Sequence, residues 1–441
     1  MPSWYENMFY WCMNARSPPE TSDDEEEELG VGNALAWSKD LEKHYCGELS
    51  YAVCQANQFI EDYSHVEIGK NVILVGIYDG HGGPQTANFI RDHLIDNLLA
   101  IYGSFMWNLV TVSIEDKRTI DEATMRETIS AVEDEFLSYV RVNYNVSPQI
   151  LKVGSCCLVG VIWNGVLQIA NLGDSRAIVG SVSRCNKLSV EQLTVDHNVN
   201  RDEIRQEVRD LHPNDPDIVS VSRGAWRIEG VIQVSRSIGD VYLKNPVVPE
   251  DPLFPKPRFG KAVVSAEPAL LSRVLHRHDK FLIFASDGLW QYLSNEQAAE
   301  IVHLSPRDGV AKKLVRAALK AAAKAMKVTY QALLNADLAG RRVYHDDITV
   351  IVVFLDHRFV HRRDTDMTEL SIKGILSVSE SHLLVITNAD IGLEGHVKVK
   401  VINLRMVGIR AKIGRSNEAP FEREIMAMER QTQQFNGQAK T

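Results

Sequence analysis

The chain is short of cysteine, of positive charge and of long apolar runs. Its six cysteines among 441 residues show neither metal-ligand spacing nor a disulfide framework. This predicts a reducing compartment inside the cell, the cytoplasm or the nucleus. There is no signal peptide and no apolar run of about 18 residues, so the sequence predicts neither secretion nor a membrane span.

Acidic residues outnumber basic ones. The chain has 58 Asp and Glu against 48 Lys and Arg, a net charge of −10 and an isoelectric point near 5.8. Such a surface repels polyanions, so nucleic acid and anionic membranes are not expected as partners. A hydrophobic share of 45% is enough for a core, and the length allows one large domain with extensions.

The most informative segment is the apolar run 73–78 followed by Asp79-Gly80-His81-Gly82-Gly83. The run predicts a buried strand, and the glycines let the chain turn and let a ligand approach the backbone. Asp79 offers oxygen to a hard cation, while His81 titrates near neutral pH. The segment suits chemistry on an oxyanion such as phosphate. The alternative is a tight loop after a core strand.

Other carboxylates stand where apolar runs begin or end. For any single pair, an Asx-turn or a solvated strand end is the simpler explanation. Together they predict a sheet edge that collects divalent cations through oxygen ligands. These pairs are Glu61-Asp62, Gly173-Asp174, Asp287-Gly288 and Asp346-Asp347.

Seven motifs follow one another between residues 47 and 356. They are Glu61-Asp62, Asp79-Gly80-His81-Gly82-Gly83, Gly154-Ser155, Gly173-Asp174-Ser175-Arg176, Val234-Ser235-Arg236-Ser237-Ile238-Gly239-Asp240, Ser286-Asp287-Gly288-Leu289-Trp290 and Asp346-Asp347-Ile348-Thr349-Val350. In this order they resemble the metal-dependent type 2C protein serine/threonine phosphatases, and the plant branch in particular. The resemblance implies an α+β fold with two antiparallel β-sheets sandwiched between pairs of helices.

The resemblance also implies a centre of two Mg²⁺ or Mn²⁺ ions, with a weaker third ion held by Asp174. Ligands that are all oxygen fit these cations and argue against zinc. Asp62 would orient water, and Asp346 rather than its neighbour Asp347 would be the ligand that precedes the last strand. The implied ligands are Asp79 on both ions, the Gly80 carbonyl and Glu61 on one, and Asp287 and Asp346 on the other.

Two such ions lower the pKa of a bridging water and clamp the oxygens of an in-line displacement. The expected reaction is therefore direct attack of hydroxide on phosphorus, without a phospho-enzyme. His81 is the candidate general acid that protonates the departing Ser or Thr oxygen. Its alternative role is a hydrogen bond to a carboxylate of the loop.

One departure from the family concerns the substrate phosphate. Many members have Arg four residues before the first acidic pair, whereas this chain has Asn57 there. Asn donates a hydrogen bond but carries no charge, so the affinity for phosphate is expected to be lower. Arg176 and Arg236 lie in motif loops and are expected either to compensate or to form structural ion pairs.

The expected domains are an N-terminal extension with an acidic linker (1–46), a catalytic domain (47–356) and a C-terminal extension of unknown fold (357–441). Within the catalytic domain, the turn Asn164-Gly165 between apolar runs 155–163 and 166–172 predicts a hairpin. The resemblance implies that the polar segment 203–230 forms a flap beside the site that contributes to substrate choice. Amphipathic helices are expected at 86–99, 122–139, 202–211, 295–302 and 309–327.

Two functions of different classes follow. The first is a metal-dependent phosphatase, a monomer that acts on phosphoserine and phosphothreonine of proteins, including kinases or kinase targets. The second is a catalytically weak or inactive protein of the same fold that binds and regulates a kinase. No metal ligand is missing, and only Asn57 and the C-terminal extension support the second function.

Overall fold

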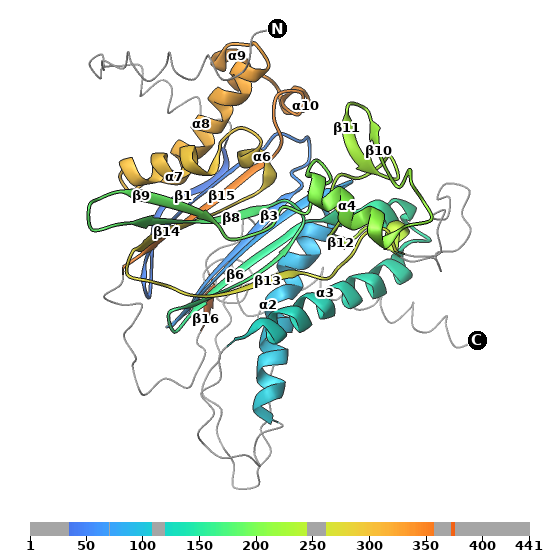
Figure 1. Ribbon diagram of the computed structural model, residues 1–441, viewed down its shortest axis with the longest axis horizontal. Coiled ribbons are helices and arrows are strands. Elements are labelled where there is room, and N and C mark those ends of the chain that lie inside the picture. The colour runs from blue at the N-terminus through green and yellow to red at the C-terminus, as the bar shows by residue number, and fades with distance from the viewer. Residues whose placement is uncertain (1–34, 70, 108–119, 245–261, 357–371, 375–441) are drawn as a thin grey trace, which may run out of the picture. The chain divides into compact units, whose positions relative to one another are not determined.

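Figure 1 shows the computed structural model, which describes residues 35–69, 71–107, 120–244, 262–356 and 372–374. Two antiparallel β-sheets form the centre, and helices cover their outer faces. This architecture confirms the α+β sandwich expected from the sequence. The expected acidic linker and the C-terminal extension lie outside these ranges, apart from residues 372–374.

Each sheet brings together segments that are far apart in the sequence. In the first sheet the order is β1 (Leu35–His44), β2 (Gly47–Cys54), β15 (Ile348–Leu355), β14 (Asp279–Ala285), β8 (Arg176–Val182) and β9 (Leu188–Gln192). In the second it is β12 (Ile238–Gly239), β5 (Gly154–Ser155), β4 (Val72–His81), β6 (Cys157–Trp163), β7 (Val166–Leu172) and β13 (Ala269–Val274), with β3 (Asp62–Gly69) paired to β4.

Strand β15 shows why the two sheets stack. All eight of its residues, Ile-Thr-Val-Ile-Val-Val-Phe-Leu, are buried, because one face meets helices and the other faces the second sheet. A continuous β-branched and aromatic run of this kind fits a strand that is covered on both faces. Between the sheets, the Phe284 ring of β14 lies where a Cβ on Gly160 of β6 would collide, so glycine is needed at that contact.

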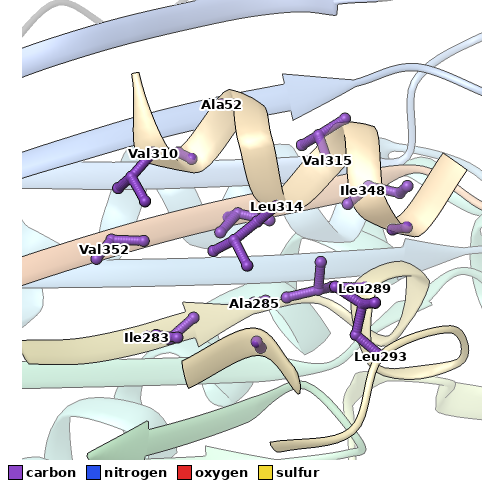
Figure 2. Packing of buried hydrophobic residues seen from close by; sticks show 14 of the residues in the cluster. Ala52, Ile283, Ala285, Leu289, Leu293, Val310, Leu314, Val315, Ile348 and Val352 are labelled. Carbon is purple, nitrogen blue, oxygen red and sulfur yellow. The ribbon is translucent and has the colours of Figure 1, made fainter. Parts of the chain in front are cut away.

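Helix α8 (Val310–Ala325) covers the outer face of the first sheet. Val310, Leu314 and Val315 point toward strands β2, β14 and β15, where they meet residues such as Val352 (Figure 2). Four alanines complete the buried face of the helix, and their small side chains let it lie close to the strands. Burial of this apolar face, rather than helix propensity, fixes the position of the helix.

Helices α2 (Gln85–Trp107) and α3 (Glu122–Asn143) cover the second sheet. The predicted hairpin is confirmed between β6 and β7, where Trp163 pairs with Val166. Asn164 and Gly165 have φ of +50° and +78°, the combination that a two-residue type I′ turn requires. The other expected helices are confirmed as α4 (Asp202–Leu211), α7 (Asn295–Leu304) and α8, while α2 continues beyond the expected end at residue 99.

The polar segment after residue 200 forms a small unit of its own. It contains α4 and a two-stranded sheet of β10 (Val219–Ser222) and β11 (Ala225–Ile228). The guanidinium carbon of Arg205 lies 4.5 Å from the centre of the Trp226 ring, and this contact connects the small sheet to the helix. Strand β1 pairs with β2, so the first sheet begins before residue 47, the expected start of the catalytic domain.

Short elements complete the structure. They are η1 (Pro148–Lys152), α5 (Val241–Lys244), α6 (Asp287–Trp290), α9 (Tyr330–Leu334), α10 (Leu338–Arg341) and β16 (Ile372–Gly374). None of the helices within the ranges that the structure describes is long and apolar enough to cross a membrane.

We predict that Leu314→Ala lowers the free energy of unfolding by about 2–5 kcal/mol, because it leaves a cavity between α8 and the first sheet. Leu314 is fully buried there. Urea denaturation followed by circular dichroism measures the change. Lys313→Ala, on the exposed face of the same helix, is the matched control and should change stability by less than about 0.5 kcal/mol. Equal effects of the two substitutions would show that α8 is not packed as described.

Candidate metal centre

The first two carboxylates face each other across neighbouring strands. Asp62 begins β3 and Asp79 lies near the end of β4, and the antiparallel register pairs them directly. Gly80 follows Asp79, and its backbone N–H donates to the Glu61 carbonyl at 3.1 Å. An added Cβ on Gly80 would come within 2.6 Å of that oxygen, so glycine permits the close approach of the two strand ends.

The other carboxylates come from the first sheet. Asp287 begins α6 directly after β14, and Asp346 stands two residues before β15. The hydroxyls of Ser286 and Thr349 donate to the same Asp62 oxygen, at 2.7 and 2.8 Å. Asp62 is buried, so this contact joins the two sheets where their strands end. The structure therefore brings the predicted residues of both sheets to one place.

The neighbouring acids Asp346 and Asp347 have different surroundings. Asp347 is buried, and its carboxylate accepts hydrogen bonds from the backbone N–H groups of Ala56, Asn57 and Glu61, at 2.6, 3.0 and 2.8 Å. These contacts fix the loop that carries Glu61. Asp347 thus has a clear structural task.

Asp346 is less enclosed and contacts charged and polar side chains. One oxygen pairs with Arg342 at 2.7 Å, and the other accepts from the Asn57 amide at 3.3 Å. The same amide donates to Asp347 at 3.1 Å. Asn57, expected near the substrate phosphate, therefore contacts the two carboxylates in this structure.

The cluster concentrates negative charge. Burial and the charge of neighbouring carboxylates raise the pKa of Asp62, Asp79 and Asp287 well above the ordinary range. The pKa of Glu61 is raised by the same causes. In the part of the chain that the structure describes, no ion pair reaches any of these four. The residues thus fit hard divalent cations, which prefer carboxylate oxygen and would balance the charge.

Asp174 and Cys156 lie beside Asp79. The ligand atoms of Asp79, Cys156 and Asp174 all lie within 4.8 Å of one another. The Cys156 thiol donates to one Asp174 oxygen at 3.3 Å, and the Asn198 amide donates to the other at 2.6 Å. The sequence analysis did not connect Cys156 with the site. Cys156 lies between β5 and β6, and the adjacent Cys157 packs in the apolar core of the second sheet.

His81 has a buried partner that the sequence analysis also missed. Its Nε2 lies 2.8 Å from Asp240 Oδ2, and the same oxygen accepts from the Ser237 hydroxyl at 2.6 Å. Partial burial lowers the pKa of His81, but the charge and hydrogen bond of Asp240 outweigh it and raise the pKa above its ordinary value. Asp240 has a φ of +49°, an uncommon conformation that marks the loop. A Cβ on Gly154 would collide with this pair.

The two arginines of the motif loops form structural contacts. Arg176 forms an ion pair with Asp196 and donates to the Asn295 side chain at 2.7 Å. Arg236 donates to Glu207 at 2.9 Å. Of the two alternatives left open by the sequence, these contacts support structural ion pairs.

Comparison with known proteins identifies the class to which this fold and site belong. The family model described as "Protein phosphatase 2C" matches residues 52–329. A rice relative (Oryza sativa subsp. japonica), "Probable protein phosphatase 2C 43", is 45% identical over 382 residues, 85% of this chain and 95% of that protein. An Arabidopsis thaliana relative, "Probable protein phosphatase 2C 68", is 48% identical over 351 residues, 78% of this chain and 86% of that protein.

The chain therefore belongs to the protein phosphatase 2C family, a family of enzymes. The fold agrees with a solved structure, serine-threonine phosphatase 2C from Toxoplasma gondii. The TM-score is 0.53 at 17% identity, and the match covers 72% of this chain and 98% of that one.

We predict that Asp79→Asn changes stability in opposite directions with and without a divalent cation. In EDTA the neutral amide relieves repulsion in the carboxylate cluster, so the variant should have a higher Tm than the wild type. In Mn²⁺ the wild type should gain about 2.7 kcal/mol at 100 times Kd, and the variant less because a ligand is altered. Thermal denaturation of both proteins in both conditions measures this.

The pH dependence provides the control for this experiment. Unfolded Asp ionises near pH 4, whereas the raised pKa keeps folded Asp79 protonated to higher pH. Without metal, the wild type therefore loses stability as the pH rises from about 4 through the raised pKa, and its disadvantage relative to the variant vanishes at low pH. A Tm difference independent of both pH and Mn²⁺ would contradict the account. Glu127→Gln, an exposed acid on α3, should change nothing.

Proposed function

We propose that this protein hydrolyses phosphoserine and phosphothreonine of other proteins with two bound Mg²⁺ or Mn²⁺ ions. The observation that carries the proposal is the carboxylate cluster where the two sheets meet. Asp62, Asp79 and Asp287 lie together there without a cationic side chain in ion-pair contact among the described residues. Membership of the phosphatase family supports the same conclusion.

In this proposal the two sheets share the work of holding the ions. Asp79 would serve both ions. Asp62, whose carboxylate accepts hydrogen bonds from Ser286 and Thr349, would position water. A weaker third ion would use Asp174. The further ligands are the Gly80 carbonyl and Glu61 for one ion, and Asp287 and Asp346 for the other.

The contacts of Asp347 support the choice of Asp346 as the ligand. Asp347 is engaged with the backbone of the loop 56–61, and a cation there would have to replace those hydrogen bonds. Asp346 instead has Arg342 on one oxygen, and that side chain is about half exposed. An exposed arginine can leave its carboxylate at small cost, because surface ion pairs contribute little.

When bound, the ions supply an acidified water and stabilise charge on the phosphoryl oxygens. His81 donates a proton to the departing Ser or Thr oxygen. Asp240 stabilises the protonated imidazole and fixes its orientation through Nε2, which leaves the Nδ1 side of the ring for the substrate. Asn57, whose amide donates to Asp346 in this structure, is proposed to contact the phosphate.

We also propose that the protein acts as a monomer in the cytoplasm or the nucleus and that its substrates include kinases or kinase targets. Free thiols at Cys46, Cys54, Cys156, Cys157 and Cys185 are consistent with a reducing compartment.

Phosphate release from a phosphothreonine peptide tests the function. Wild type should release phosphate with Mn²⁺ and none in EDTA, and Asp79→Asn should abolish release. His81→Gln should lower kcat by about 10²–10⁴-fold. The loss should be much smaller with p-nitrophenyl phosphate, because nitrophenolate leaves without protonation.

Two results would contradict the proposal. An equal loss on both substrates would show that His81 is not the acid. No release from folded, metal-loaded wild type, with or without residues 357–441, would favour the binding protein of the same fold. Glu127→Gln serves as the matched control and should behave as wild type.

A further inference from the structure

Strand β9 forms one edge of the first sheet, and half of its backbone points outward. Its partner is β8 alone, with Val190 opposite Gly180. Hydrogen bonds on either side of this ladder join Ser183 with Lys187 and Leu193 with Ala177. Antiparallel pairs alternate between bonded and non-bonded, so Leu188 and Val190 turn their N–H and C=O groups away from β8. No described residue forms a hydrogen bond with these groups.

A hollow lies between this edge and helix α7. Its volume is about 360 Å³. Figure 1 shows α7 alongside β9, on the face of the first sheet that α8 also covers. A strand added to β9 would turn every second side chain toward this helix. Most of the lining comes from Leu188 and Val190 of β9 and from Glu296, Glu300, His303 and Leu304 of α7.

The lining of the hollow combines acid with apolar surface. Glu296 and Glu300 are exposed and lie one helical turn apart. Glu296 accepts a hydrogen bond from the Ser294 hydroxyl at 2.9 Å, and no ion pair engages either glutamate in the described part of the chain. Leu304 is 73% exposed at the end of the same helix face. Residues four apart on a helix are about 6 Å apart along its axis, close to the roughly 6.6 Å between alternate residues of a strand. Basic side chains at alternate positions would therefore meet both glutamates.

We propose that β9 and α7 form a docking groove for an extended segment of a partner protein with Lys or Arg at alternate positions. The segment adds to the sheet as a seventh strand beside β9, through backbone hydrogen bonds to Leu188 and Val190. Its basic heads pair with Glu296 and Glu300, and its aliphatic stems cover Leu304. The groove contains no residue of the metal centre, so docking is independent of the proposed chemistry.

The probe is a fluorescein-labelled peptide, Lys-Val-Lys-Thr-Lys-Val-Lys, titrated with the full chain and followed by fluorescence anisotropy. Val190→Pro removes an outward N–H but no bond to β8, so the sheet should survive. Val190→Ala, which keeps the N–H, is its control. Glu300→Lys reverses one charge of the groove, and Glu127→Lys makes the same change on α3. Circular dichroism and hydrolysis of p-nitrophenyl phosphate confirm that each variant is folded.

The expected result is binding by wild type, Val190→Ala and Glu127→Lys. Val190→Pro and Glu300→Lys should each weaken it roughly tenfold or more, a change of about 1.4 kcal/mol. A peptide N-methylated at alternate amides should not bind. Equal binding by all variants would show non-specific charge attraction, and no binding would show an unused sheet edge. Either result overturns the proposal, and neither bears on phosphatase activity.

Discussion

The Asp62 carboxylate accepts two hydroxyl hydrogen bonds, from Ser286 and Thr349, and so connects strands of one sheet to the other at the place where the carboxylate cluster lies. A buried carboxylate is costly unless its charge is compensated. Further carboxylates surround Asp62, which raises the cost. The centre is therefore consistent with a fold completed by cations. The same ions that supply the chemistry would hold the two strand ends together.

The positive side chains near the centre are mostly engaged in structural contacts. Arg176 and Arg236 have acidic partners of their own, and Arg342 pairs with Asp346. In the proposed function, substrate phosphate would therefore be recognised chiefly by the cations. At the β9 edge, the exposed Glu296 and Glu300 have no ion-pair partner among the described residues and are available to a basic partner. Catalysis and docking would thus use separate parts of the domain.

Local patterns in the sequence predicted much of the fold. The Asn164-Gly165 turn, the amphipathic face of α8 and the apolar runs that end in acid all depend on neighbouring residues. The sequence analysis did not find the contact between His81 and Asp240, which are 159 residues apart. Likewise, no local pattern places Cys156, between β5 and β6, against Asp174. Such contacts depend on how the two sheets stack, and no short segment records that.

Strand β1 gives a second example of the same limit. The composition of residues 35–44, with several charged side chains, predicts an N-terminal extension, yet these residues pair with β2 at the edge of the first sheet. An edge strand tolerates charge because one side remains open to water. Its pairing is decided by the neighbouring strand rather than by its own composition.

The central claim is that the two sheets jointly hold a pair of divalent cations. Anomalous diffraction from crystals grown with Mn²⁺ tests it most directly. The account predicts two strong peaks on either side of the Asp79 carboxylate, one near Glu61 and the other near Asp287 and Asp346. A single peak, or Mn²⁺ bound away from Asp79 in a well-ordered crystal, would contradict it.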